Sequence, residues 1–67
     1  MIVLNGERTD VHAGATVAAA LARVGVKPDA RGVAVAVDGE VVPRSTWEAF
    51  ALAEGSHVEV LTAMQGG

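Results

Sequence analysis

The chain opens with an apolar run, a turn signal and a polar run, which is the pattern of a β-hairpin. The apolar residues 1–4 end at Asn5-Gly6, a dipeptide that readily takes the positive φ angles of a two-residue hairpin turn. The polar residues 7–11 predict a second strand near a sheet edge. Because the first strand lacks polar alternation, we expect both of its faces to be covered or nearly so.

The next apolar positions follow a helical period and predict an amphipathic helix over residues 16–24. Four apolar side chains recur at the i, i+3, i+4 and i+7 spacing that places them on one helix face. These side chains are Val17, Ala20, Leu21 and Val24. Alanine is frequent in the same window and raises the helix propensity. Thr16 is a favourable N-cap, and Gly25 is a natural residue to end the helix.

The middle of the chain predicts a loop and a second hairpin. Residues 26–32 contain proline, aspartate and glycine and are expected to form the loop. Val33–Val37 carries β-branched residues at alternate positions and ends at Asp38-Gly39, a second strong hairpin-turn signal. Glu40–Val42 is the returning strand, which Pro43 stops because proline has no N–H to donate to a ladder.

A short helical turn is expected at residues 45–50. Ser45 and Glu48 have the spacing of a capping box, with serine at the N-cap and glutamate at the N3 position. Trp47 or Phe50, the two aromatic residues of the chain, is expected to hold this turn against the core.

The chain is expected to close with a strand at residues 57–63, after a turn at 54–56, and with a flexible tail at residues 64–67. The two most apolar strands open and close the domain, so we expect residues 1–4 to lie beside residues 57–63 in the middle of the sheet. If these strands are parallel, their connection carries the helix across one sheet face. The predicted fold is α+β. A single domain over residues 1–63 forms a roll in which a mixed five-stranded sheet packs on one helix and a short helical turn.

Composition narrows the possible functions. The chain has 67 residues, enough for one small domain, and no cysteine, which excludes disulfides, thiolate metal sites and a catalytic thiol. A net charge of −3, without a cluster of Lys and Arg, disfavours nucleic-acid binding. No segment has the basic leader of a signal peptide or the roughly 20 apolar residues of a membrane span. We therefore expect a cytoplasmic protein that binds neither nucleic acid nor membrane.

Residues suited to catalysis or metal binding are sparse. His12 and His57 lie at predicted strand termini without cysteine or a paired carboxylate, and we expect both to be surface residues. Asp38 and Glu40 flank a hairpin and are expected to be solvated rather than to act as a catalytic pair. We expect no metal, no bound cofactor and no enzyme active site.

Two glycines, Gly66 and Gly67, end the chain directly after an apolar strand. One explanation is a frayed terminus without a role. Another uses the terminal carboxylate, which a partner enzyme can activate with ATP to an acyl-adenylate that a nucleophile then attacks. Glycine has no Cβ and can pass through a narrow channel to such a site. In that case Gly67 is the modified residue, and a partner recognises Gly66, Gln65 and Met64.

A flexible tail loses entropy when it is bound, so a surface on the domain must supply affinity. If Val58 and Val60 face the helix, Leu61 and Ala63 point to the open face of the sheet beside the tail. There they either form a docking surface or close a small second core under the Trp47 segment. Only a contiguous apolar patch would indicate binding.

Residues 35–47, with the sequence VAVDGEVVPRSTW, combine an apolar strand, an Asn-Gly-like turn, a Val-Pro-Arg segment and a nearby tryptophan. Residues 4–7 (LNGE) and 14–17 (GATV) and the terminal Gly66-Gly67 complete a pattern that spans essentially the whole chain. In these features the sequence resembles the ThiS family, the sulfur carriers of thiamine biosynthesis. The resemblance implies a ubiquitin-like β-grasp fold. Asp38 stands where that family often has asparagine.

The resemblance also implies a carrier chemistry. In that family a ThiF-like enzyme uses ATP to adenylate the terminal carboxylate, here that of Gly67. A persulfide sulfur delivered by another protein displaces AMP, and the resulting thiocarboxylate gives its sulfur to a ThiG-like thiazole synthase. The chain is then a co-substrate and not a catalyst. The Val-Pro-Arg segment implies a partner-facing or a structural role for Arg44, for which a salt bridge with a neighbouring acid is the simpler alternative.

Three other functions are compatible with the same residues. The small subunit of molybdopterin synthase shares the fold, the Gly-Gly end and the thiocarboxylate chemistry, although the Val-Pro-Arg segment and the short length favour the thiamine branch. A ubiquitin-like covalent modifier is also possible, with Lys27 as the only lysine of the chain. A plain interaction domain would not use its terminal glycines.

Overall fold

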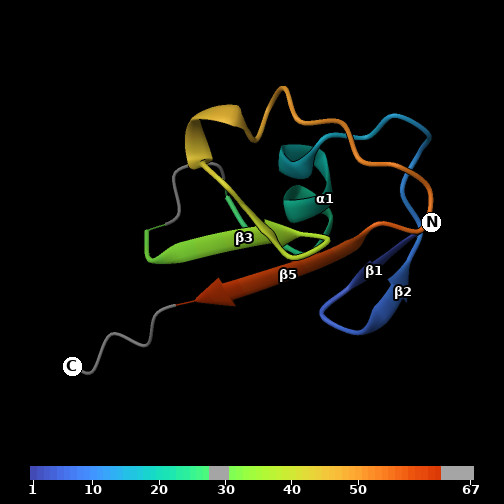
Figure 1. Ribbon diagram of the computed structural model, residues 1–67, viewed down its shortest axis with the longest axis horizontal. Coiled ribbons are helices and arrows are strands. Elements are labelled where there is room, and N and C mark those ends of the chain that lie inside the picture. Colours follow the sequence, from blue (N-terminus) through green and yellow to red (C-terminus); the bar gives the residue numbers. More distant parts are fainter. Residues whose placement is uncertain (28–30, 63–67) are drawn as a thin grey trace.

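The computed structural model describes residues 1–27 and 31–62, and residues 28–30 and 63–67 lie outside the described part of the chain. Ala63 and the expected tail, residues 64–67, are therefore not placed. The described elements follow one another in the order β1 (Ile2–Leu4), β2 (Glu7–Thr9), α1 (Val17–Arg23), β3 (Val33–Val37), β4 (Glu40–Val42), η1 (Arg44–Thr46) and β5 (His57–Thr62). Figure 1 shows α1 lying across one face of the sheet.

The five strands form one mixed sheet in the order β2-β1-β5-β3-β4. β1 and β5 are parallel neighbours, with Val3 opposite His57 and Leu4 opposite Val58. All other pairings are antiparallel. The expected pairing of the first and last strands is thus confirmed, and β5 is the central strand (Figure 1). Strand β2 ends at Thr9 rather than at residue 11.

The core lies between α1 and one face of the sheet. Alternate residues of the strands point into it, and the three buried residues of α1 close it from above. Its buried members are Ile2, Leu4, Val17, Ala20, Leu21, Val35, Val37, Val42, Trp47, Leu52 and Val58. Ile2 and Leu4 are buried on the α1 side, whereas Val3 is partly buried, so the second face of the first strand is covered only in part. The face to which Val3 points has no covering layer within residues 1–27 and 31–62.

Both ends of α1 are satisfied by hydrogen bonds. At the N-terminus, the Thr16 hydroxyl accepts from the N–H of Ala19, as expected for an N-cap. The preceding N–H groups, of Val17 and Ala18, donate to carbonyls of the segment that follows η1. At the C-terminus, Gly25 has a φ of +85° and the N–H of Val26 bonds to the carbonyl of Leu21, which is a Schellman motif.

The segment after β4 differs from its expected form. The helical turn begins at Arg44, and the expected capping box of Ser45 and Glu48 does not form; instead, the Thr46 hydroxyl donates to the carbonyl of Pro43. Pro43 precedes the turn and leaves Ser45 inside it, where its side chain is not at a cap position. Of the two aromatic residues, Trp47 is the buried one, whereas Phe50 is 38% exposed.

Candidate functional site

β5 is the strand that precedes the terminal glycines in the sequence. On the side of β5 that faces β1, it is hydrogen-bonded by the side chain of Asn5 from the first hairpin. β1 ends at Leu4, and the chain turns away at Asn5 and Gly6, whose φ angles are +49° and +82°. The Asn5 amide takes the place of the next strand residue. Its Oδ1 accepts from the N–H of Val60 at 2.8 Å, and its Nδ2 donates to the carbonyl of Val60 at 3.3 Å. The side chain thereby extends the ladder by one residue after the strand itself has ended.

The second hairpin holds the other side of β5 in a similar way. Asp38 has a φ of +49° at the turn between β3 and β4, and its Oδ1 accepts from the N–H of His57 at 2.9 Å. The backbone N–H of Asp38 donates to the carbonyl of His57 at 2.8 Å. The two hairpin dipeptides were expected as turns, but their contacts with β5 were not. The one signal in the sequence for these contacts is that the first residue of each turn, Asn5 or Asp38, has a polar side chain.

The open face of the sheet carries a contiguous apolar patch beside the end of β5. Leu61 is 67% exposed and Val41 is 75% exposed. Ala34 lies opposite Leu61, and Ala36 lies opposite Val41, so the four side chains adjoin across three strands. We call Ala34, Ala36, Val41 and Leu61 the open-face patch.

The exposure of Leu61 argues against one of its two expected roles, burial in a second core. A second core under the Trp47 segment would have buried Leu61, but the Trp47 ring lies in the core on the α1 side of the sheet. Leu61 therefore belongs to the open-face patch. The other half of the open face is polar, because Arg8 and His57 both lie beside Val3, and Glu59 lies opposite Ala36. The face is thus apolar toward the end of β5 and charged toward β1 and β2.

Arg44 packs against Trp47. Its guanidinium carbon lies 4.7 Å from the centroid of the indole ring, which is within the range of a cation–π interaction. The indole N–H donates to the carbonyl of Val42 at 2.9 Å. These contacts give Arg44 a packing role on the α1 side of the sheet, whereas Leu61 lies on the open face. The structure does not bring the two together in one patch.

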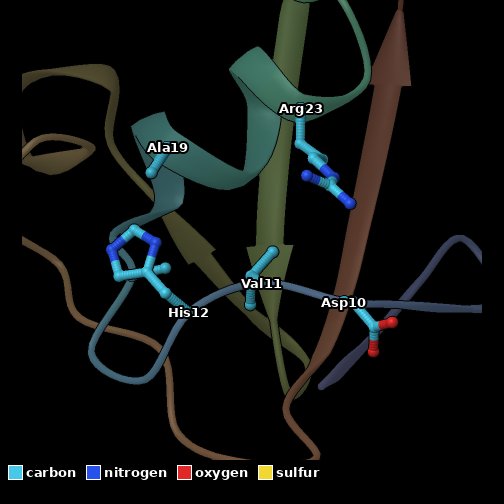
Figure 2. A pocket seen from close by; sticks show the side chains of 6 residues that line it. Asp10, Val11, His12, Ala19 and Arg23 are labelled. Atoms are coloured by element: carbon cyan, nitrogen blue, oxygen red, sulfur yellow. The ribbon is translucent and has the colours of Figure 1, made fainter.

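A shallow cleft lies between α1 and the segment that joins β2 to α1. Its volume is about 330 Å³, and Asp10, Val11, His12, Ala15, Ala19 and Arg23 line it. Figure 2 shows the His12 ring and the Arg23 guanidinium on either side of Val11, with the Asp10 carboxylate turned away from both. A catalytic site requires its functional groups to converge on one point, and these groups do not. His12 and His57 are exposed, as expected.

The rest of the described part of the chain offers no second candidate site. Among residues 1–27 and 31–62, no three of His, Cys, Asp and Glu lie close enough to hold a metal ion. No helix in this part of the chain is long and apolar enough to cross a membrane. Every buried side-chain nitrogen and oxygen in the same residues has a hydrogen-bond partner. The features that remain are β5, the open-face patch and the two glycines that follow.

Comparison with known families identifies the fold. The sequence matches the ThiS family over residues 2–67, a range that includes Gly66 and Gly67. This chain belongs to the ThiS family. The crystal structure of the thiamine biosynthesis protein ThiS from Geobacter metallireducens is 31% identical, with a TM-score of 0.77 over 98% of this chain and 97% of that one. The α+β fold with a mixed five-stranded sheet, expected as a ubiquitin-like β-grasp, is confirmed.

Two more relatives of this ThiS-family chain are informative. The solution structure of a thiamine biosynthesis protein from Geobacter metallireducens is 30% identical, with a TM-score of 0.75 over 98% of this chain and 86% of that one. A protein of Paramagnetospirillum magneticum named thiazole synthase is 38% identical over 66 residues, which are 98% of this chain and 20% of that protein. The ThiS-family chain therefore spans about a fifth of the length of this curated relative.

Proposed function

We propose that this ThiS-family protein is a sulfur carrier of thiamine biosynthesis, and that it serves as a protein co-substrate rather than as an enzyme. The observation that carries the proposal is the match to the family over residues 2–67, because this match includes both terminal glycines. The relative named thiazole synthase supports the thiamine branch over the molybdopterin branch. We place the protein in the cytoplasm.

The proposed chemistry takes place on Gly67. A ThiF-like enzyme binds ATP, and the Gly67 carboxylate attacks the α-phosphorus of the ATP. This step forms an acyl-adenylate and releases pyrophosphate. A persulfide sulfur on a donor protein then attacks the acyl carbon and displaces AMP. A thiol cleaves the resulting acyl disulfide and leaves a thiocarboxylate on Gly67. A ThiG-like thiazole synthase accepts this sulfur. The carrier itself binds no cofactor, since ATP is bound by the partner.

The domain contributes a surface to this chemistry. Leu61 and the rest of the open-face patch offer exposed apolar area next to the end of β5, and Ala63 follows in the sequence. We propose that this patch docks the adenylating enzyme and the synthase, while Met64, Gln65 and Gly66 pass into the partner. Such docking compensates for the entropy that the tail loses on binding. Arg44 is proposed to support docking indirectly, through its contact with Trp47.

The first experiment is an intact mass measurement on the protein isolated from its own cells. The chemistry requires a free carboxylate on Gly67. Fragmentation of the protein in the mass spectrometer must therefore identify Gly67 as the C-terminal residue. The protein is then incubated with a ThiF-like enzyme, ATP and a persulfide donor. We expect a mass increase of one oxygen-to-sulfur exchange on Gly67, followed by its loss when thiazole synthase and its substrates are added.

A variant that lacks Gly67 is the matched control, because it retains the whole described domain. It should show neither ATP–pyrophosphate exchange nor the mass change. Sulfur exchange in the deletion variant, or none in the wild type, would refute the carrier function. Loss of the sulfur with the large subunit of molybdopterin synthase and its substrate, but not with thiazole synthase, would instead assign the protein to the molybdopterin branch. Conjugates to lysine would indicate a modifier.

A further inference from the structure

The sheet has two outer edges, and both are poorly suited to pairing with another strand. The outer strand β2 is three residues long and carries Glu7 and Arg8. The outer strand β4 is also three residues long, and Pro43 follows it directly. Short strands, charged side chains and proline are the devices by which proteins prevent pairing at a sheet edge. The two outer edges are therefore unfavourable for pairing with a strand of another protein.

A third edge exists inside the sheet, because β1 is only half as long as its neighbour β5. β1 has three residues and β5 has six. The N–H of Asn5 donates to the carbonyl of Val58, and the Asn5 amide then covers Val60. Past Val60, the position beside β5 on this side is not filled by any strand of residues 1–27 and 31–62. The unfilled position continues the line of β1.

The backbone of Thr62 faces this unfilled position. The polar backbone groups of a strand alternate between its two neighbours. Val58 and Val60 bond toward β1 and Asn5, whereas the backbone of His57 bonds toward Asp38 at the end of β3. Thr62 follows Val60 by two residues, so its N–H and carbonyl point to the β1 side. No described residue bonds to them there.

We propose that the ThiF-like adenylating enzyme adds an extended segment of its own backbone to β5 at Thr62. This segment would occupy the position that a longer β1 would fill. This inference rests on the proposed function and names the mode of docking. An extended segment can add to an exposed strand edge through main-chain hydrogen bonds, with affinity that depends little on its sequence. The adjoining Leu61 side chain is 67% exposed and would lie against the same partner.

The position of Thr62 in the chain indicates which protein supplies the pairing segment. Thr62 is the last described residue of β5, and the residue proposed to react is five positions later. A partner that holds the tail must therefore pass close to Thr62. Pairing at Thr62 would fix the direction in which the following residues leave the sheet and would present them in extended form. Strand addition thus orients the tail toward the adenylation site.

The test compares Thr62→Pro with Thr62→Ala. Proline removes the Thr62 N–H and is tolerated at the edge of a sheet, while alanine removes the same side chain and keeps the N–H. Both variants should keep the wild-type melting temperature to within a few degrees, because the Thr62 N–H has no partner in the described sheet. A single lost hydrogen bond changes affinity by up to about tenfold. We expect Thr62→Pro to bind a ThiF-like enzyme about 5–10-fold more weakly than Thr62→Ala.

Equal affinities of the two variants would overturn the proposal. If Thr62→Pro instead fails to fold, amide hydrogen exchange of the wild-type protein decides. The Thr62 amide should exchange at least about tenfold more slowly when the ThiF-like enzyme is bound. An unchanged exchange rate at Thr62, with slower exchange elsewhere on β5, would refute strand addition.

The failure of this inference is distinguishable from the failure of the proposed function. If the wild-type protein binds the enzyme and supports ATP–pyrophosphate exchange, but the proline variant behaves like the alanine variant, the carrier function stands and strand addition fails. If the wild-type protein does not support ATP–pyrophosphate exchange, the carrier function itself fails.

Discussion

The contact between Asn5 and Val60 should make a measurable contribution to stability, and two substitutions separate its parts. Asn5→Gly removes both side-chain hydrogen bonds but keeps a residue that accepts the φ of +49° without strain. Asn5→Ala removes the same bonds and also places a Cβ that disfavours this φ. The difference between the two variants therefore isolates the backbone strain, and the glycine variant isolates the hydrogen bonds.

The expected magnitudes follow from the geometry. The bond from Val60 N–H is short at 2.8 Å, and the bond to the Val60 carbonyl is long at 3.3 Å. An intramolecular hydrogen bond contributes about 0.5–1.5 kcal/mol net, so the pair should contribute about 1–2 kcal/mol. The left-handed conformation of alanine costs a further ~1 kcal/mol. We expect Asn5→Gly to lose about 1–2 kcal/mol of unfolding free energy and Asn5→Ala about 2–3 kcal/mol.

Thermal and urea unfolding followed by circular dichroism measure these losses. For a domain of this size, a loss of 1 kcal/mol lowers the melting temperature by about 4–8 °C. A chain of 67 residues has a total stability of only about 3–10 kcal/mol, so both changes should be large on that scale. If Asn5→Gly is within about 0.5 kcal/mol of the wild type, the Asn5 amide does not hold β5, and the reasoning is refuted.

Three further predictions concern the core, the open-face patch and the tail. Trp47→Phe should lose about 2–3 kcal/mol of unfolding free energy, because it removes the hydrogen bond to Val42 and weakens the contact with Arg44; a loss below 1 kcal/mol in urea unfolding would contradict this. Leu61→Asp should leave the unfolding free energy within about 0.5 kcal/mol of wild type and weaken binding to the ThiF-like enzyme, and a large fall in melting temperature would show that Leu61 is a core residue. Gly67→Ala should unfold like the wild type but slow ATP–pyrophosphate exchange, because the added methyl group must pass through the tail channel; an unchanged exchange rate would argue against such a channel.

Local patterns were sufficient to predict most of the fold. The helix followed from the spacing of Val17, Ala20, Leu21 and Val24. The first three are buried in α1, whereas Val24 is the C-cap and is 46% exposed. Both hairpins followed from Asn5-Gly6 and Asp38-Gly39, whose residues all have positive φ. These signals are short-range, because the periodicity or the turn is encoded by adjacent residues. The pairing of β1 with β5 followed from the apolar character of both strands, whereas their parallel orientation is seen only in the structure.

Contacts between distant residues could not be predicted in this way. The Asn5 amide bonds to Val60, 55 positions away, and the Asp38 carboxylate bonds to the His57 N–H, 19 positions away. A sequence shows that these side chains are polar but does not show which backbone group they meet. The capping box at Ser45 was wrong for a related reason, since Pro43 and the buried Trp47 fix where the turn begins.

The isolation of Trp47 has a practical consequence for every one of these experiments that keeps this residue. The chain contains one tryptophan and no tyrosine, so its near-ultraviolet fluorescence comes essentially from a single indole. That indole is 3% exposed on the α1 side of the sheet, away from the open-face patch. Its emission should shift to longer wavelength when the core opens and should stay constant when a partner covers Leu61. The protein thus contains its own optical reporter, which distinguishes an unfolded variant from a folded one that has lost its docking surface.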